Sequence, residues 1–391
     1  MTDFLSESEV LSGYTKTLRR DFHAHPELGF HEVRTAGIVA KELTALGLEV
    51  ATGIGGTGVT ALIEGTTPGP VVLLRADMDA LPIVEETGAP YASQNPGVMH
   101  ACGHDGHTAI LLTVAKMLCA HRDELAGTVK LIFQPAEEGM GGAEKMIDAG
   151  VLENPRVDTV LALHLWNEKP LGWIGVPDGP AMAGAEYFKI KVRGKGGHGA
   201  VPHLAVDPVL ASAQIVSALQ GIVSRNVAPL QAAVVSVCTI HGGEAFNVIS
   251  PEVEMTGTIR SFEPAVRARV LERFNKTVNA VADAMGCQAE IDVQRLTPAT
   301  INSPEIAAKI QSVARKLFPE TVVDATNYTT MGSEDFAFVL EKVPGCFFFI
   351  GSANPGKGLD AGHHHPKFDF DENALPRAAA LMAAAAIAAL H

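Results

Sequence analysis

The sequence has few cysteines and little positive charge. Its five cysteines are odd in number and scattered along the chain, so they do not form the paired pattern of a disulfide framework. Lys and Arg number 30 against 44 Asp and Glu, which gives a formal net charge of −14 at pH 7. No basic block offsets this charge, so we expect neither nucleic acid nor an anionic membrane surface as a partner.

A hydrophobic run long enough to cross a membrane is also absent. The most apolar long stretch, AAALMAAAAIAALH at 378–391, is too short and too rich in alanine to span a bilayer. It follows Pro376, which predicts a closing helix. The N-terminal residues MTDFLSESEV lack the basic and apolar segments of a signal peptide, so we expect a cytoplasmic protein.

The length of 391 residues exceeds that of a typical single core and predicts two domains. Apolar strands alternate with helices over residues 1–182 and 297–391, which predicts a discontinuous α/β domain with a largely parallel sheet and helices on both faces. Residues 183–296 have a different pattern of predicted elements, in the order β-α-β-β-α-β. This order predicts an inserted, ferredoxin-like α+β domain.

Two glycine-rich segments fit the dinucleotide-binding fingerprint G-x-G-x-x-G. GIGGTG at 53–58 is followed by the β-branched VTALIEG, and GKGGHG at 194–199 runs into Pro202 and Pro208. The fingerprint requires a helix directly after the glycines, and neither segment provides one. We therefore expect no nucleotide site.

Residues that bind metals recur at the ends of the predicted strands. The segment MHACGHDGHT places Cys102, His104 and His107 within six positions. Other strand ends supply Asp77, Asp79, Glu137, Glu138, His164, His363, His364 and His365. Taken alone, Cys102 could be a small buried hydrophobe, His107 a cap on a helix that begins near Thr108, and His164 a core histidine. Their joint placement favours a metal site.

Glu137 and Glu138 carry the most information in this set. Two adjacent carboxylates after an apolar strand repel each other unless a cation offsets their charge. We expect Glu138 to bind a metal and Glu137 to act as general base toward a metal-activated water.

A series of motifs runs through the chain in a fixed order: RADMDALP, MHACGHDGHT, QPAEEG, LALH, GKGGHGAVPH, AFNVIS, GTIRSF, GSEDF and HHPKFDFDE. This series resembles the M20 metallopeptidase family over essentially the full chain. Within that family it is similar to the amidohydrolase branch of hippurate hydrolases, N-acyl-amino-acid hydrolases and auxin-conjugate hydrolases.

The resemblance implies a centre with two divalent metal ions. Cys102 would bridge them as a thiolate, and further ligands would be His104, Glu138, His164 and His364. The family has a ligand histidine, any residue and then proline, which selects His364 from the triple histidine. Asp77 would orient the ligands without binding a metal itself, and His107 would support the loop. Zinc or manganese is expected, with cobalt or nickel also compatible.

For the inserted domain, the resemblance implies a lid and a dimerisation surface. His198 would reach the active site of the partner subunit and help stabilise the tetrahedral oxyanion, so we expect a homodimer or homotetramer. Asn247 and Arg260 match positions near the substrate, and a guanidinium suits a free carboxylate. Arg260 could equally form a surface ion pair on its strand. Ser250 stands where the branch commonly has proline, which predicts only a local effect on the loop.

The implied activity is hydrolysis of a small-molecule N-acyl or N-aroyl amino acid, such as hippurate, to a carboxylic acid and an amino acid. A dipeptidase or aminopeptidase that uses the same site is the main alternative. A hydrolase with Cys102 as nucleophile and His104 or His107 as base would leave Glu137 and Glu138 unexplained. A metal- or ligand-binding protein without activity would have no need for a base.

Overall fold

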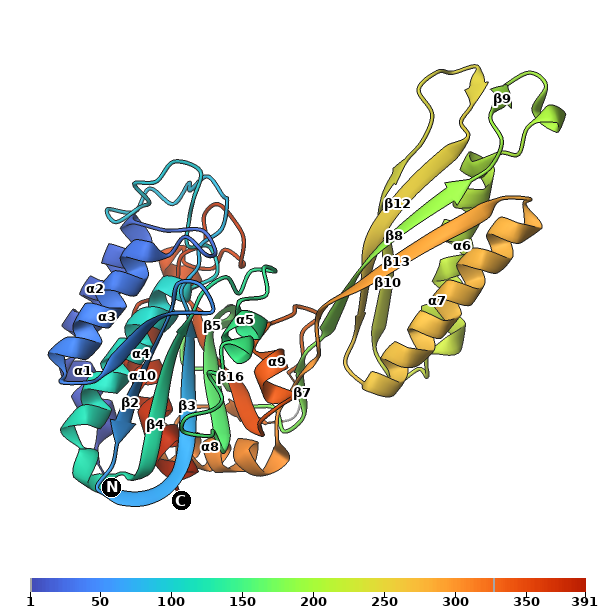
Figure 1. Cartoon of the computed structure of the whole chain (residues 1–391). Helices are drawn as coiled ribbons and strands as arrows, with labels where there is room; N and C mark the ends of the chain where they lie inside the picture. Colours follow the sequence, from blue (N-terminus) through green and yellow to red (C-terminus); the bar gives the residue numbers. More distant parts are fainter. Residues whose placement is uncertain (1, 326–327) are drawn as a thin grey trace. The chain divides into compact units, whose positions relative to one another are not determined.

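The computed structural model describes residues 2–325 and 328–391 (Figure 1). The chain divides into two compact units. Unit 1 comprises Met1–Ala181, Ile301–Thr329 and Glu334–His391, and unit 2 comprises Met182–Thr300 and Thr330–Ser333. Within the described residues, no helix combines the length and the apolar character that crossing a bilayer requires.

Unit 1 contains an eight-stranded sheet with the order β1-β2-β4-β3-β5-β16-β6-β15. Its strands are β1 (Val50–Ile54), β2 (Gly58–Glu64), β3 (Thr67–Asp77), β4 (Ala126–Gln134), β5 (Thr159–Pro170), β6 (Ile174–Gly175), β15 (Val323–Asp324) and β16 (Gly345–Ala353). The central strands β4, β3, β5 and β16 are parallel. The β1–β2, β2–β4 and β16–β6 pairs are antiparallel, so the expected largely parallel sheet is instead mixed.

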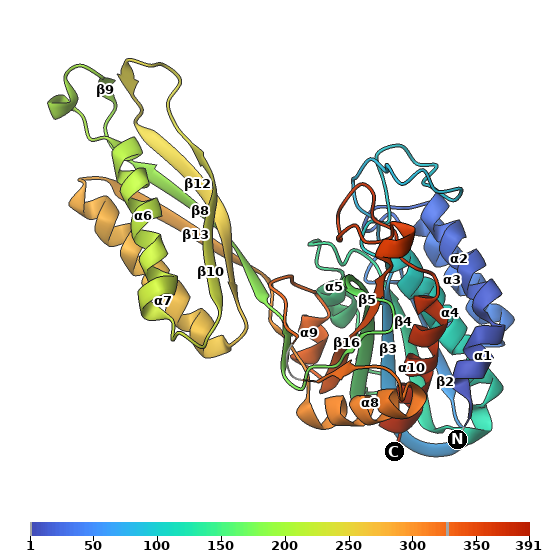
Figure 2. The same cartoon turned by 180° about the vertical axis from the view of Figure 1, so that it is seen from behind.

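Helices cover both faces of this sheet. Figures 1 and 2 show α2, α3, α4 and α10 on one side and α5 and α9 on the other. The helices of unit 1 are α1 (Phe4–Val10), α2 (Ser12–Ala24), α3 (Val33–Ala45), α4 (His104–Ala120), α5 (Gly142–Asp148), α8 (Pro304–Leu317), α9 (Ala337–Leu340) and α10 (Ala374–Ala389), with short 3-10 turns at Arg122–Glu124 and Pro355–Lys357. The expected closing helix corresponds to α10, whose alanines are largely buried.

Alternation along the strands separates two kinds of side chain. Val72, Leu74 and Ala76 of β3 join the large apolar core together with α4 and α10. Because successive side chains of a strand point to opposite faces, Arg75 and Asp77 lie on the other face. The polar residues of β4 and β5 follow the same rule, so one face of the sheet is apolar and the other carries charged groups near its carboxyl end.

Unit 2 contains a four-stranded antiparallel sheet with the order β10-β12-β8-β13. Its main elements follow the chain order β8 (Gly184–Arg193), α6 (Pro208–Asn226), β10 (Ala233–His241), β12 (Glu252–Ser261), α7 (Pro264–Ala284) and β13 (Gln288–Thr297). This is the β-α-β-β-α-β order of a ferredoxin-like domain. Smaller elements are β7 (Pro180–Met182), which pairs with β14 (Thr300–Ile301), β9 (Gly197–His198), which pairs with β11 (Val248–Ile249), and a 3-10 turn at Pro202–Leu204.

The core of unit 2 lies between the sheet and its two helices. Phe274 of α7 is fully buried, and its ring centroid lies 4.7 Å from that of Phe188 on β8. Leu219 of α6 belongs to the same apolar cluster. The aromatic pair therefore joins a helix to the sheet at the centre of the unit.

We predict that Phe274→Ala lowers the free energy of unfolding by about 3–5 kcal/mol, because it leaves a cavity in a packed core. Chemical denaturation followed by circular dichroism measures this change. Leu230→Ala removes a fully exposed side chain of unit 2 and should change that free energy by less than about 0.5 kcal/mol. Equal effects of the two substitutions would contradict the assignment of this core.

Candidate metal centre

The carboxyl ends of the parallel strands bring together the polar residues singled out in the sequence. Asp77 is the last residue of β3, and Glu137 and Glu138 follow the end of β4 at Gln134. His164 lies within β5, which continues to Pro170, and not at a strand end as expected. Its side chain nevertheless faces the same side of the sheet as Asp77.

The start of α4 supplies a thiol and two imidazoles. Gly103 caps this helix in the left-handed region, with φ of 93°, and Cys102 directly precedes it. The helix begins at His104 and not near Thr108, so His107 lies in the first turn and is no cap. The left-handed turn at Gly103 thus places Cys102 and His104 next to each other near the carboxyl ends of the parallel strands.

His107 acts as a support within this arrangement. Its Nε2 accepts a hydrogen bond from the Leu165 backbone N–H at 2.9 Å. The ring proton is therefore on Nδ1, which donates to Asp77 Oδ1 at 2.7 Å. His107 thereby connects the end of β3 to β5.

Two groups of candidate ligands share the thiol of Cys102. One group is Cys102, His104 and His164, and the other is Cys102, Glu138 and His364; within each, the ligand atoms all lie within 4.8 Å of one another. Cys102 Sγ is 3.5 Å from His164 Nε2, and Glu138 Oε1 is 3.1 Å from His364 Nε2. Two donor sets that overlap at one sulfur fit a pair of cations with a bridging thiolate.

Each of the two imidazoles of the first group is oriented through its Nδ1 by a backbone carbonyl. His104 Nδ1 donates to the Asp79 carbonyl at 2.9 Å, and His164 Nδ1 donates to the Leu165 carbonyl at 2.6 Å. Each Nε2 is therefore left as the ligand atom, and that of His104 is buried without a hydrogen-bond partner among the described residues. Imidazoles oriented by backbone carbonyls are typical of metal ligands, so this donor set fits a divalent metal.

Charges around these donors also favour a cation. Burial and the charge of Glu138 raise the pKa of the Cys102 thiol, so a thiolate here requires positive charge nearby. Burial alone would lower the pKa of His104, but the charge of Asp77 raises it well above its usual value. Burial and the neighbouring His107 keep the pKa of His164 well below its usual value, which leaves the neutral imidazole that metals bind.

Glu137 lies at the edge of the ligand groups, on a strained loop. Ala136 has φ of 53°, a conformation held by a hydrogen bond from its N–H to Glu32 Oε1 at 2.9 Å. Glu137 Oε1 accepts the Asp335 backbone N–H at 3.2 Å. Burial and the charges of Glu334 and Glu138 raise the pKa of Glu137 well above its usual value. A carboxyl group whose pKa is raised in this way holds a proton more readily than an exposed glutamate does, which suits exchange of a proton with a neighbouring group.

The sequence analysis missed the ionic cluster behind these residues. Arg75 is buried and bonds Asp77 Oδ2 at 2.6 Å, Glu334 Oε1 at 2.8 Å and Asp335 Oδ1 at 3.2 Å. Glu334 and Asp335 belong to the GSEDF motif, for which the sequence alone indicated no function. An arginine two residues before Asp77 in an otherwise apolar strand is the signal that could have revealed it, because a buried charge needs partners.

The contacts of His363 and His364 distinguish these two residues of the triple histidine. His364 has φ of 63°, donates its backbone N–H to the Ala101 carbonyl at 2.8 Å and alone joins a candidate ligand group. His363 Nε2 donates to the Leu165 carbonyl at 3.1 Å, and its ring stacks on Trp166 at a centroid distance of 4.6 Å. Burial lowers the pKa of His363 to about 4. His363 is thus an anchor of the loop.

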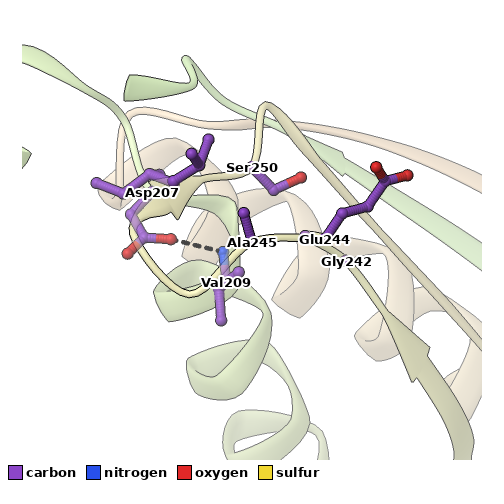
Figure 3. A pocket seen from close by; sticks show the side chains of 9 residues that line it. Asp207, Val209, Gly242, Glu244, Ala245 and Ser250 are labelled. Atoms are coloured by element: carbon purple, nitrogen blue, oxygen red, sulfur yellow. Dashed lines mark hydrogen bonds between the residues drawn. The ribbon is translucent and has the colours of Figure 1, made fainter. Parts of the chain in front are cut away.

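The remaining predicted site residues lie in unit 2. His198 is exposed on β9, faces Val248 of β11 in the register, and its Nδ1 accepts the Ala200 N–H at 3.0 Å. Exposed Asn247 precedes β11, and its carbonyl accepts the Gly199 N–H at 2.8 Å. A pocket of about 360 Å³ lies beside β11. Figure 3 shows its lining residues Asp207 and Ser250, and the Asp207 carboxylate accepts the Val209 N–H at the start of α6. Ser250 Oγ donates to the Glu252 carbonyl at 2.7 Å, a local turn.

Arg260 lies on β12, and burial lowers its pKa. Its Nη1 donates to Ser333 Oγ at 2.9 Å. The part of the chain that the structure describes provides no carboxylate partner for it, so the alternative of a surface ion pair is not observed.

Comparisons with known proteins agree with this geometry. A model of peptidase family M20/M25/M40 matches residues 73–388. An N-acetyl-L-cysteine deacetylase from Bacillus subtilis is 41% identical over 361 residues, which cover 92% of this chain and 84% of the deacetylase. Thermostable carboxypeptidase 1 from Saccharolobus solfataricus is 41% identical over 362 residues, 92% of this chain and 91% of that protein.

A solved structure extends the likeness to three dimensions. The crystal structure of a Bacillus subtilis protein, described as a dinuclear metal-binding peptidase of the M20 family, matches with a TM-score of 0.86 and 37% identity. The match covers 98% of this chain and 99% of the other. The resemblance inferred from the motifs is thereby confirmed. The chain belongs to peptidase family M20/M25/M40 and is a hydrolase that acts on amide bonds.

Proposed function

We propose that this chain is a metal-dependent amidohydrolase that cleaves the amide bond of N-acyl or N-aroyl amino acids. The observation that carries the proposal is the overlap of two ligand groups at Cys102, with the buried carboxyl group of Glu137 beside them. The deacetylase relative, whose name states an N-acetyl amino acid as substrate, supports the acyl specificity.

Two divalent metal ions would be held by this chain. Cys102, His104 and His164 would hold one ion, and Cys102, Glu138 and His364 the other, while Asp77 would fix His107 and the ligands around it. The soft thiolate suits zinc, and the imidazole and carboxylate ligands also admit manganese, cobalt or nickel. When bound, the ions would supply Lewis-acid polarisation of the amide carbonyl and activation of water.

Glu137 would move the proton. Its raised pKa and its position beside the ligands support a role as the base that takes a proton from the attacking water and then donates it to the leaving amine. The hydrogen bond from the Asp335 N–H to Oε1 would orient the carboxyl group during both transfers.

Residues of unit 2 would complete the site, with His198 reaching it from a second subunit. The exposed imidazole of His198 would stabilise the oxyanion of the tetrahedral intermediate, and Asn247 would lie near the substrate. Arg260, half-buried and without a carboxylate partner among the described residues, would bind the free carboxylate of the amino acid. Exposed apolar side chains on and beside the paired strands β9 and β11 support contact with another copy: Val201, Leu204, Phe246 and Val248. We therefore propose a homodimer or homotetramer.

A peptidase with the same centre is the second candidate function. The carboxypeptidase relative favours it, because a peptide and an N-acyl amino acid share the amide bond and the terminal carboxylate. The two functions differ in the group on the N side of the bond, which is a free amine in a dipeptide and an acyl group in hippurate.

We predict that the wild-type chain binds two metal ions and that Cys102→Ala loses most of both, because the thiol belongs to both ligand groups. Inductively coupled plasma mass spectrometry of metal-reconstituted, desalted protein measures the content. Cys119→Ala, near the other end of α4, is the matched control and should keep two ions. Full metal content in Cys102→Ala would exclude Cys102 as the shared ligand.

We further predict that Glu137→Gln keeps its metal but lowers kcat by roughly 10²–10⁴-fold, because it removes the proton acceptor. Hydrolysis is measured on hippurate, N-acetyl amino acids and free dipeptides, with metal-free and metal-loaded protein. Glu144→Gln changes an exposed carboxylate on α5 and should leave kcat unchanged. Cleavage of dipeptides alone would support the peptidase. Metal-free activity that is lost on thiol alkylation would favour Cys102 as nucleophile.

The role of His198 in the partner subunit is tested with mixed oligomers. Co-expression of Glu137→Gln and His198→Ala chains with different tags allows purification of the heterodimer. One of its two sites would then combine intact Glu137 with intact His198, so we expect about half of the wild-type activity from two nearly inactive parents. His203→Ala, a change at a neighbouring exposed histidine, should retain activity on its own. A heterodimer no more active than its parents would show that His198 does not act across subunits.

A further inference from the structure

The candidate ligand His364 lies on a loop that has no regular structure of its own. Residues 361–369 contain neither helix nor strand, and His364 itself has φ of 63°. Its side chain is 53% exposed, so packing holds it only weakly. A left-handed, half-exposed histidine keeps its orientation only if the ends of its loop are fixed by something else.

One buried side chain bonds both ends of this loop. Asn167 Nδ2 donates to the Ala361 carbonyl at 2.8 Å and to the Asp369 carbonyl at 2.9 Å. Its Oδ1 accepts the Ser352 hydroxyl at 3.1 Å. Asn167 is only 3% exposed, and both its N–H groups are used on these two carbonyls. The side-chain amide of Asn167 therefore joins the two ends of the 361–369 loop.

The two ends of the loop depend on Asn167 to different degrees. The Asp369 carboxylate also binds Arg19 at 2.7 Å and the Tyr91 hydroxyl at 2.7 Å. The end that leads to His364 is held by Ala361 on Asn167 and by His363 on the Leu165 carbonyl, and His364 itself donates its N–H to the Ala101 carbonyl at 2.8 Å. Of these contacts, the bond to Asn167 fixes the start of the loop. Loss of the amide would thus release the side of the loop on which His364 lies.

We propose that Asn167 is a positioning residue that holds His364 in place for one of the two metal ions. This inference rests on the proposed function, since it requires His364 to be a ligand. His364 occurs only in the group with Cys102 and Glu138. The other group comes from the start of α4 and from β5 and includes no residue of the loop. Loosening the loop therefore weakens one ion and leaves the other bound.

The chain offers a closely matched control in Asn302. This residue is also buried in unit 1, and its Nδ2 donates to the Pro177 carbonyl at 2.9 Å and the Phe347 carbonyl at 2.8 Å. Its Oδ1 accepts the Phe347 N–H at 2.7 Å. Asn302→Ala thus removes three buried side-chain hydrogen bonds, as Asn167→Ala does, and the described bonds of the Asn302 side chain go to Pro177 and Phe347, outside the 361–369 loop.

The experiment measures stepwise zinc binding by competition with a chromophoric chelator and counts bound ions by mass spectrometry. In Asn167→Ala we expect one ion to keep its wild-type affinity and the other to bind roughly 10–100-fold more weakly, the usual effect of losing a residue that orients a ligand. Asn302→Ala should keep two ions at wild-type affinity, although both substitutions lower the melting temperature. Ser352→Ala removes only the hydroxyl that orients the amide and should weaken the same ion by a smaller factor.

The outcomes separate this inference from the proposed function. A wild-type chain that binds no metal overturns the proposed function. A wild-type chain with two ions, together with an Asn167→Ala protein whose two affinities are unchanged, overturns the role of Asn167 alone. Equal weakening of both ions in Asn167→Ala and in Asn302→Ala also overturns it, because the effect is then one of general stability. If Asn167→Ala does not fold, Ser352→Ala decides: weakening of one ion supports the role, and unchanged binding of both overturns it.

Discussion

Asp77, Glu137, Glu334 and Asp335 are four buried carboxyl groups that gather at the carboxyl end of the sheet, and Glu138 lies next to them. Carboxylates at such short separations cannot all stay ionised unless positive charge compensates them. Arg75 supplies that charge on one side through its bonds to Asp77, Glu334 and Asp335. On the other side Glu138 and the thiol of Cys102 lie beside the imidazoles of His164 and His364, and the proposed metal ions would complete the electrostatic balance there.

The alternation of the strands makes this arrangement compatible with a stable fold. The face of the sheet toward α4 and α10 is apolar, and the helices on that side form one large core with it. On the opposite face Arg75 and Asp77 lie near the carboxyl end of β3, where the parallel central strands finish together, and Lys130 lies in the middle of β4. A domain can bury an arginine and several carboxylates in this way, because the apolar face provides the hydrophobic stabilisation that the polar face lacks.

Much of the candidate centre could be predicted because its residues stand in short motifs at or near the elements that position them. Cys102, His104 and Glu138 stand in short motifs next to apolar strands or a helix, and their chemistry is visible in the sequence. Arg75, Glu334 and Asp335 were missed, because their meaning depends on a contact between segments 259 residues apart. The sheet was expected to be largely parallel, but the antiparallel β2–β4 pair and the reversal at β6 depend on spatial strand order, which periodicity does not reveal. His364 was chosen over His363 by resemblance, and the buried anchor role of His363 explains physically why the choice is consistent.

The strand order of unit 1 also has a consequence for synthesis on the ribosome. β16 lies between β5 and β6, yet it is made more than 170 residues after them, when unit 2 is already complete in the nascent chain. Unit 2 is continuous except for four residues and can fold as soon as it emerges, whereas the sheet of unit 1 keeps an open edge until β16 inserts. His364 follows β16, so the last candidate ligand emerges only after the sheet can close. The connectivity therefore delays completion of the Cys102, Glu138 and His364 group until the strands around it have been made, whereas the residues of the other group are all made earlier.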